Sequence, residues 1–467
     1  MKYANYRSVE SNWLEDVPIH WDFLRLKMVL QERKEKNNPV VTDNILSLTA
    51  NQGVIPVGEK EGSGGNKPKE DLTLYNVARE NDLLVNCMNV VSGAAGVSKY
   101  TGAISPVYYA LTPRDSKRVN IWYYHHLFRM LPFQRSLLGL GKGILMHESN
   151  TGKLNTVRMR ISMDYLNNTM LPIPPIEEQN QIVAYIDWKS SEINKLIKSM
   201  RKQMSLLIEQ KDSLIFDTVF SGIGKSEKRY VEGLWFNSVG KKWDVKRIKY
   251  LFDLRDERNY KPLSEVNLIS LYTKLGVVQN SDVEYTTGNR ATNADGYKIV
   301  YEDDIVVNII LCWMGAMGRS AYNGVTSPAY DIYKPQNDVC SRYYHYLFRT
   351  KPFIEQCYKE GRGIMAMRWR TYSSQFRGIK VPVPPYMEQI QIADWLDDKC
   401  RDFDNAINSL QSQIDLLNEI KTRLVFDAIT GKKDIRNIEI PDYITIEDMD
   451  EASIDEELTA ESIDEEV

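Results

Sequence analysis

The chain is poor in the residue types that build disulfide frameworks and metal sites. Its 467 residues include only five cysteines and five histidines. The histidines show no spacing typical of zinc ligands, so we predict no metal site. The cysteines show no paired spacing either, which predicts reduced thiols in a cytoplasmic protein. They are Cys87, Cys312, Cys340, Cys357 and Cys400.

Long hydrophobic runs are also missing. No run of about 18 apolar residues exists, so we expect no membrane-spanning helix. The polar start MKYANYRSVESNWLED lacks the apolar core of a signal peptide. Hydrophobic residues make up 43% of the chain and charged residues 26%, which is typical of a soluble globular protein. The length predicts two or three domains, each with its own core.

Basic residues are absent from the end of the chain. Residues 437–467 contain 13 acidic residues and no Lys or Arg. Because the net charge is −4, residues 1–436 carry +9. A basic body favours a polyanion as partner. The acidic tail is predicted to be disordered, with solvation as its simplest role and partner docking or self-masking as alternatives.

Three short runs resemble catalytic or cofactor-binding motifs, but each match is incomplete. The PPY run at 384–386 resembles the end of the adenine-methyltransferase motif, but Val383 stands where that motif needs Asp, Asn or Ser. The GKS run at 224–226 ends like a phosphate-binding loop, but Val219 stands where that loop needs glycine. The glycine-rich run at 139–143 is too short for a dinucleotide fingerprint. We therefore predict that the chain is not an enzyme by itself.

What the sequence has instead is a large internal repeat. LPIPPIEEQNQI from Leu171 recurs as VPVPPYMEQIQI from Val381, an offset of 210 positions. Between the repeated anchors the segments diverge, as at 55–70, which suggests one scaffold with two targets. Drift after an old duplication is the alternative. The earlier anchors are Trp21, Asp22, Arg25 and Lys27 against Trp243, Asp244, Arg247 and Lys249, DLLVN from Asp82 against DIVVN from Asp304, and YYHHLFR from Tyr123 against YYHYLFR from Tyr343.

Each copy of the proline-rich motif opens a heptad pattern that predicts a long helix. We expect helices of roughly 40–45 residues, about 60–68 Å at 1.5 Å per residue. Pro175 and Pro385 suit the first helical turn, and Gly222 and Gly431 mark the ends. The apolar seams should pair with each other. Before them, short runs such as NILSL, DLLVN and PVYYALT predict strands, the YYHHLFR segments predict helices, and His125 and His345 are read as packing residues.

Basic residues gather in the segments that diverge most between the copies. Lysines lie in a glycine-rich loop near residue 65, and a cluster of arginines and Trp369 lies near residue 365. Phosphate contacts supply affinity for DNA, whereas contacts to base edges supply specificity. The predicted DNA-binding residues are Lys60, Lys67, Lys69, Lys99, Lys142, Lys153, Arg158, Arg160, Lys274, Arg290, Arg319, Arg362, Arg368, Trp369 and Arg370.

The doubled Pro-Pro-…-Glu-Gln motif before a long helix, with the WD-x2-R-[LI]-K entry, resembles the specificity subunit of type I restriction–modification systems. The resemblance covers residues from about 12 to 436 and implies a DNA-binding protein that reads a split, asymmetric double-stranded sequence. It also implies that two methyltransferase subunits dock on the helices, that restriction–translocase subunits join, and that S-adenosylmethionine, ATP and magnesium belong to these partners. Met387 departs from the first copy, which has Glu177. The residues implied for the spacer and for docking are Pro174, Pro175, Glu178, Gln179, Ile193, Met200, Leu207, Pro384, Pro385, Glu388, Gln389, Phe403, Leu410 and Leu417.

We therefore expect a mixed α/β (α+β) fold with two pseudo-twofold-related target-recognition domains and two long antiparallel coiled-coil helices. Two other functions stay open: a coiled-coil scaffold with protein-only partners, and a single-chain DNA-modifying enzyme. The expected domains are target-recognition domain 1 at 1–170, the first spacer helix at 171–225, target-recognition domain 2 at 226–380, the second spacer helix at 381–436, and the tail at 437–467.

Overall fold

The computed structural model describes residues 2–49, 53–59, 69–140, 142–143, 146–148, 154–156, 159–224, 227–273, 275–280, 293–363 and 369–446. The chain divides into two compact units: unit 1 comprises residues 1–200 and 412–467, and unit 2 comprises residues 201–411. Both units combine helices with strands, as the sequence predicts. The long helices are α5 (Ile176–Ser221) and α9 (Tyr386–Ile429). Each of them runs through both units, because the division falls after residue 200 in α5 and after residue 411 in α9.

A four-stranded antiparallel sheet in the order β4-β11-β8-β9 lies at the centre of unit 1. Its strand β8 (Leu83–Asn86) is buried along its whole length. Because side chains alternate along a strand, Leu83 and Val85 enter the main core and Leu84 enters a smaller core on the opposite face. Burial on both faces accounts for the unbroken apolar run. The other elements are β1 (Tyr6–Ser8), β2 (Asp16–Pro18), β3 (Asp22–Arg25), α1 (Leu26–Val29), β4 (Leu30–Glu32), β5 (Leu46–Thr49), β6 (Gly53–Pro56), β7 (Asn76–Ala78), β9 (Ala95–Val97), β10 (Gly102–Ile104), β11 (Tyr108–Pro113), α2 (Ile121–Arg129), α3 (Leu131–Ser136), β12 (Lys142–Gly143), β13 (Met146–Glu148), β14 (Leu154–Thr156), β15 (Met159–Arg160), α4 (Met163–Leu166) and β16 (Met170–Ile173).

Unit 2 repeats this sheet strand for strand, in the order β20-β27-β24-β25. In strand β24 (Ile305–Asn308), Ile305 and Val307 enter the main core, and Val306 enters the smaller one. The two halves of the chain therefore share a topology as well as anchor residues. The other elements are β17 (Lys228–Tyr230), β18 (Ser238–Gly240), β19 (Asp244–Arg247), β20 (Phe252–Arg255), β21 (Ile269–Tyr272), β22 (Gly276–Gln279), β23 (Lys298–Val300), β25 (Met317–Arg319), β26 (Gly324–Thr326), β27 (Tyr330–Pro335), α6 (Ser341–Phe348), α7 (Lys351–Glu360), α8 (Ser373–Phe376) and β28 (Lys380–Val383).

The repeated entry and exit segments of each unit pair with each other. Strand β3, which contains the WD-x2-R anchor, pairs antiparallel with β16, and β19 pairs with β28 in the same way. Residues 171–173 and 381–383 are therefore strands of the globular parts, and the helices begin only at Ile176 and Tyr386. This corrects the expected spacer boundaries at 171 and 381.

The two prolines lie one step before the predicted position. The carbonyl oxygens of Pro175 and Pro385 accept the amides of Gln179 and Gln389 at 2.9 and 3.0 Å, so the prolines cap the helices from outside. A proline in this position still needs no amide hydrogen. The predicted helix ends are confirmed, because α5 stops at Ser221 and α9 at Ile429, shortly before Gly222 and Gly431 with φ values of 78° and 72°.

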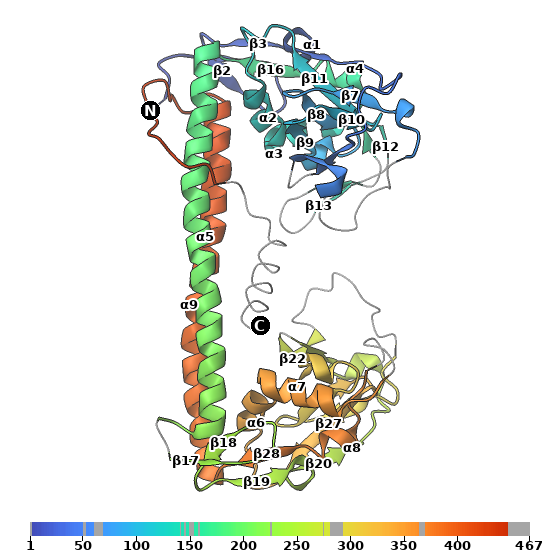
Figure 1. Cartoon of the computed structure of the whole chain (residues 1–467), viewed down its shortest axis with the longest axis vertical. Helices are drawn as coiled ribbons and strands as arrows, with labels where there is room; N and C mark the ends of the chain where they lie inside the picture. The colour runs from blue at the N-terminus through green and yellow to red at the C-terminus, as the bar shows by residue number, and fades with distance from the viewer. Residues whose placement is uncertain are drawn as a thin grey trace. The chain divides into compact units, whose positions relative to one another are not determined.

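Within each unit, parts of α5 and α9 lie side by side (Figure 1). In unit 1, the Tyr185 hydroxyl contacts the Lys433 ammonium at 2.5 Å, and Asn194 Oδ1 accepts from Lys421 Nζ at 3.0 Å. Tyr185 on α5 thus contacts Lys433 just after α9, whereas the later residue Asn194 contacts the earlier residue Lys421. The two helices are therefore antiparallel, as predicted. In unit 2, the ammonium of Lys211 pairs with Asp404 at 2.6 Å.

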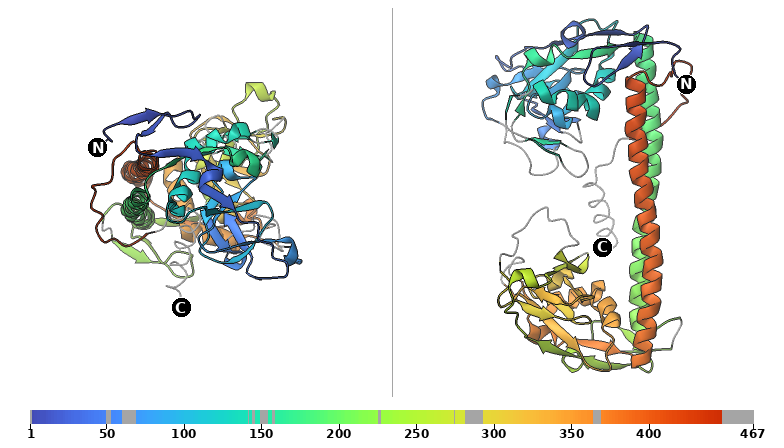
Figure 2. Two further views of the ribbon diagram at one scale, coloured as in Figure 1. Left: turned by 90° about the horizontal axis from the view of Figure 1, so that it is seen from above. Right: turned by 180° about the vertical axis from the view of Figure 1, so that it is seen from behind.

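The ends of the two helices occupy equivalent places in the two units. The Tyr343 hydroxyl donates to the carbonyl of Val219 at 2.7 Å near the end of α5, and the Tyr123 hydroxyl donates to the carbonyl of Ile429 at 2.6 Å at the end of α9. The first strand of the chain lies beside the end of α9 (Figure 2), where Tyr6 donates to the Gly431 carbonyl at 3.0 Å. The first strand of the chain therefore meets the residues that follow α9 in unit 1.

The acidic tail is not disordered throughout. Residues 437–446 lie along α5 in unit 1, where Gln181 donates to the carbonyl of Ile438 at 2.6 Å and Asn194 donates to that of Ile446 at 2.8 Å. Ile438 and Ile440 pack against the main core. The expectation of a disordered tail is wrong for these ten residues, and 447–467 lie outside the described residues.

Candidate nucleic-acid interface

A short two-stranded stem in unit 2 brings three predicted DNA-binding residues together. Arg362 and Arg370 face each other as cross-strand partners, and their amides and carbonyls exchange hydrogen bonds of 2.9 and 3.0 Å. Trp369 stacks on Tyr358 with ring centroids 5.0 Å apart, and its Nε1 donates to the Tyr358 carbonyl at 3.0 Å. A side chain at Gly361 would collide with the indole of Trp369. The tryptophan thus braces the stem, a role that the sequence did not reveal.

An equivalent stem exists in unit 1. Lys142 in β12 is the cross-strand partner of Arg160 in β15. The Arg160 guanidinium lies beside Cys87 and Tyr109, and these two groups raise its pKa. After each stem the backbone docks in the same way: the Ile161 amide donates to the Cys87 carbonyl, and the Thr371 amide donates to the Ile309 carbonyl. The segment between the two cations is ten residues longer in unit 1 than in unit 2.

The remaining predicted cations are not gathered at the stems. Arg319 is the last residue of β25 in unit 2 and forms ion pairs with Asp303 at 2.5 Å and with Glu302 at 3.5 Å. Lys69 and Lys99 are exposed in unit 1. Seven predicted residues lie outside the described residues, namely Lys60, Lys67, Lys153, Arg158, Lys274, Arg290 and Arg368.

The Glu-Gln pair of the repeated motif turns inward at the start of α5. Glu178 accepts from Trp21 Nε1 at 3.0 Å and from the Tyr3 hydroxyl, and it contacts His20 Nε2 at 2.8 Å. Gln179 accepts from the amide of Asn120 at 2.8 Å and donates to two backbone carbonyls. Both side chains are buried. They attach the helix to the globular part of unit 1.

The same arrangement recurs at the start of α9. Glu388 accepts from Trp243 Nε1 at 3.0 Å, and Gln389 accepts from the amide of Cys340 at 2.9 Å and donates to the Pro384 carbonyl at 2.8 Å. Glu178, Gln179 and Gln389, which the sequence assigned to the spacer or to subunit docking, are thus buried within the chain and attach the helices, and any docking role stays a prediction. Pro174 and Pro384 are buried as well, whereas Pro175 and Pro385 are exposed.

Comparison with known proteins decides what kind of protein carries these paired stems. Residues 240–421 match the family model of the type I restriction modification DNA specificity domain. Residues 240–421 therefore form a type I restriction modification DNA specificity domain. The chain is similar to the type I restriction enzyme MjaVIII specificity subunit of Methanocaldococcus jannaschii, with 30% identity over 134 residues. That match covers 27% of this chain and 30% of the relative, so it spans less than a third of the relative's length.

Solved structures resemble the chain over a much larger share. One chain, from a structure concerned with complex assembly and conformational transition of the type I R-M system, has a TM-score of 0.63 at 12% identity over 89% of this chain and 99% of its own length. This likeness shows a shared fold. The HsdS subunit from Thermoanaerobacter tengcongensis has a TM-score of 0.48 at 14% identity, covering 89% of this chain and 98% of that one. Among the described residues, no helix combines the length and apolar character needed to cross a membrane.

The side chains of the predicted helix seam are buried to different degrees along its length. Ile193 and Ile197 on α5 and Ile414 on α9 are buried, and Leu396 lies in the main core of unit 2. The other seam residues are half-buried, namely Met200, Leu207, Phe403, Leu410 and Leu417. Whether these side chains also meet a methyltransferase subunit stays a prediction.

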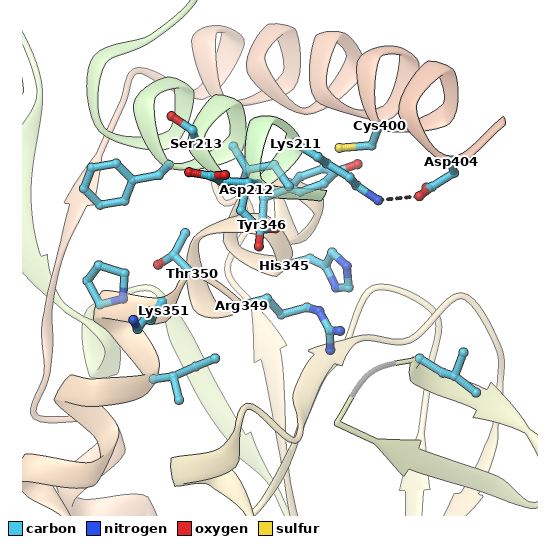
Figure 3. Close-up of a pocket in the computed structure, with 16 residues that line it drawn as sticks. Lys211, Asp212, Ser213, His345, Tyr346, Arg349, Thr350, Lys351, Cys400 and Asp404 are labelled. Atoms are coloured by element: carbon cyan, nitrogen blue, oxygen red, sulfur yellow. Dashed lines mark hydrogen bonds and ion pairs between the residues drawn. The ribbon is translucent and has the colours of Figure 1, made fainter. Parts of the chain in front are cut away.

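A cavity of about 890 Å³ lies in unit 2, between the helix pair and the globular part (Figure 3). Lys211 of α5 points to Asp404 of α9 along one wall, and His345 and Arg349 line the other. Burial, with Arg349 and Arg319 nearby, lowers the pKa of His345 to about 3, so its ring is neutral and accepts the Arg319 amide at 3.1 Å. Burial likewise raises the pKa of the Cys400 thiol. His345 is half-buried and hydrogen-bonded to the backbone, which agrees with the packing role predicted for it.

Proposed function

We propose that the chain is the sequence-reading subunit of a type I restriction–modification complex. Each globular unit would read one half of a bipartite, asymmetric target in double-stranded DNA, and the helix pair would set the distance between the halves. Two methyltransferase subunits would dock on the helices, and restriction–translocase subunits would join them. These partners would work in the cytoplasm.

One observation carries this proposal. The chain holds the same framework twice, with the same strand order and the same helix attachments, whereas the segments between the anchors differ in sequence and length. A framework that is kept while its intervening segments diverge suits two readers of different sequences. The specificity domain at residues 240–421 and the basic stems support the choice of DNA as the ligand.

The chain would supply no chemistry of its own. In the unit 2 cavity, burial and nearby arginines lower the pKa of His345 and leave its ring a weak base, burial raises the pKa of the Cys400 thiol, and Lys211 is paired with Asp404. S-adenosylmethionine, ATP and magnesium would therefore be bound by the partner subunits. Sequence reading and assembly are the tasks that remain for this chain.

An exchange of one unit tests the proposal. Residues 244–383, from the first residue of β19 to the last of β28, would be replaced by the matching segment of a related subunit, so that the strand pair is exchanged as a whole. Methylated sites would be mapped by long-read sequencing of a host genome that also expresses the methyltransferase. We expect one half of the methylated sequence to change, with the gap and the other half unchanged.

The matched control exchanges residues 22–173, from β3 to β16, and should change the other half only. A change of both halves by either exchange would contradict the model of two independent readers. Unchanged methylation with both exchanges would show that the sequence is read elsewhere.

A further inference from the structure

Residues 437–446 form a strap that lies along α5 in unit 1 (Figure 1). Gln181 donates a hydrogen bond to the carbonyl of the second strap residue at 2.6 Å. At the other end, Asn194 donates to the carbonyl of Ile446 at 2.8 Å, and the Ser191 hydroxyl accepts the Ile446 amide at 3.2 Å. Gln181 and Asn194 are 13 positions apart, so the strap covers roughly 20 Å of the helix. These three side chains form the α5 strip, which binds the backbone of the strap.

The two ends of the strap are held differently. Ile438 and Ile440 pack against the main core of unit 1. Residues 441–445 are exposed, and the two hydrogen bonds of the Ile446 backbone hold this part to α5. A segment with few buried apolar contacts opens at a lower free energy than one packed in a core. Residues 441–446 can therefore leave α5 while Ile438 and Ile440 stay in place.

Unit 2 has an α9 strip at the equivalent positions, 210 residues later in the chain. It comprises Gln391, Arg401 and Asp404, which are all exposed, whereas Ser191 of unit 1 is only 5% exposed. Within the described ranges, no backbone group forms a hydrogen bond with the three α9 side chains. Two of them are charged, whereas the α5 strip is neutral. The strips are thus equivalent in position but differ in charge and in exposure.

We propose that the strap is a gate over the α5 strip that controls the docking of a methyltransferase subunit on unit 1. The inference rests on the proposed function, in which two such subunits dock on the helices. Two identical subunits would meet an open strip on α9 and a covered strip on α5, and the one on unit 1 docks only after residues 441–446 leave the helix. The tether to α9 keeps the strap at a high effective concentration beside α5, so the strap competes with a partner for that surface. Because the apparent affinity for a site falls with the fraction of molecules in which the site is open, the covered strip binds more weakly.

The test compares two truncations of the full chain, one after Ile440 and one after Ile446. The first removes the part of the strap that bonds to Ser191 and Asn194, and the second keeps the whole strap as a matched control. Each protein would be titrated calorimetrically with the methyltransferase subunit of the same restriction–modification system, and native mass spectrometry would count the bound subunits. Truncation after Ile440 should raise the affinity for the second subunit roughly tenfold, as expected for a strip that is open in about one parent molecule in ten. The affinity for the first subunit should not change, and the protein truncated after Ile446 should bind like the parent.

Hydrogen exchange gives an independent readout of the gate. In the parent chain, the amides of residues 442–446 should lose protection when the second subunit binds and not when the first binds, because the Ile446 amide bonds to Ser191 in the closed strap. The melting temperatures of both truncated proteins should equal that of the parent, since Ile438 and Ile440 still cover the core. A lower value after truncation at Ile440 would make residues 441–446 a fixed part of unit 1 and overturn the gate.

The binding data have three outcomes that contradict the gate. An unchanged affinity for the second subunit after truncation at Ile440 would show that the strap does not control docking. A weaker affinity would make the strap part of the docking surface, and an equal gain in both truncated proteins would assign the effect to the negative charge of residues 447–467. A parent chain that binds no methyltransferase subunit would instead refute the proposed function.

Discussion

At the scale of single residues, the equivalent glutamates Glu178 and Glu388 attach their helices through different sets of contacts. Glu178 is buried and contacts Tyr3, His20 and Trp21, and its negative charge together with burial raises the pKa of Tyr3. The equivalent Glu388 is only half-buried against Trp243. The N-terminal residues of the chain thus add partners in unit 1 that unit 2 does not need.

The half-buried His345 of unit 2 predicts a pH dependence of stability. The pKa of His345 is about 3 in the folded protein, whereas an unfolded histidine titrates near 6.5. Below about pH 6.5 the unfolded state binds a proton that the folded state does not bind. The free energy of unfolding should therefore fall as the pH drops from about 6.5 toward 3, and be unaffected by this group above that range.

Urea unfolding at pH 7.5 and at pH 5 would measure this effect for the parent chain and for His345→Gln. The variant is expected to be less stable at pH 7.5, because the Arg319 amide loses its acceptor, but to lose less stability between the two pH values. An equal loss in both proteins would mean that His345 does not titrate between the folded and unfolded states.

At the scale of elements, the helices show how a periodic pattern translates into packing. The heptads predict the seam correctly, yet burial along it is uneven, from fully buried Leu396 to half-buried Leu207. Polar contacts interrupt the seam at equivalent positions, where Lys211 meets Asp404 and Lys421 meets Asn194. Such pairs favour one register of the two helices over others.

Two substitutions on neighbouring positions of α9 separate the seam from the exposed face. Ile414 is 2% exposed, whereas Leu416 is 55% exposed. Ile414→Asp should lower the free energy of unfolding by about 3 kcal/mol or more, because it buries an unpaired carboxylate. Leu416→Asp should change it by no more than about 0.5 kcal/mol. Thermal and urea unfolding would measure both, and similar effects would contradict the assigned seam.

At the scale of the whole molecule, the tail has two parts with different roles. Residues 437–446 use backbone groups to bind α5 side chains and apolar side chains to cover the core of unit 1. Residues 447–467 contribute 11 acidic groups and no basic one. Residues 437–446 are thus part of the fold of unit 1. Residues 447–467 add negative charge to the protein.

Two truncations distinguish these parts. Removal of 447–467 should leave the melting temperature unchanged and leave DNA affinity equal or higher, since 11 like charges that repel DNA are lost. Removal of 437–467 should also lower the melting temperature, because Ile438 and Ile440 no longer cover the core. Calorimetry and anisotropy would measure the two quantities. Much weaker DNA binding after the shorter truncation would make the acidic segment a contact surface.

The sequence alone determined the duplication, the two long helices and the buried central strands. Helical periodicity and an unbroken apolar run are local patterns, because a helix face or a strand buried on both sides is encoded within a few neighbouring residues. Gly222 and Gly431 could mark the helix ends for the same reason. The positions of Ile305, Val306 and Val307 on two faces of one strand follow from alternation alone.

Only the tertiary structure decided what the conserved-looking motif residues and the basic residues do. Glu178 meets Tyr3 across 175 positions of sequence, and Gln179 meets the Asn120 amide across 59, so no local pattern could show that the motif attaches the helix to the globular part. Arg362 and Arg370 likewise become a facing pair only when the strands align. A hydrogen-bond partner is chosen by the folded path of the chain, which brings distant groups together, whereas a sequence window records only near neighbours.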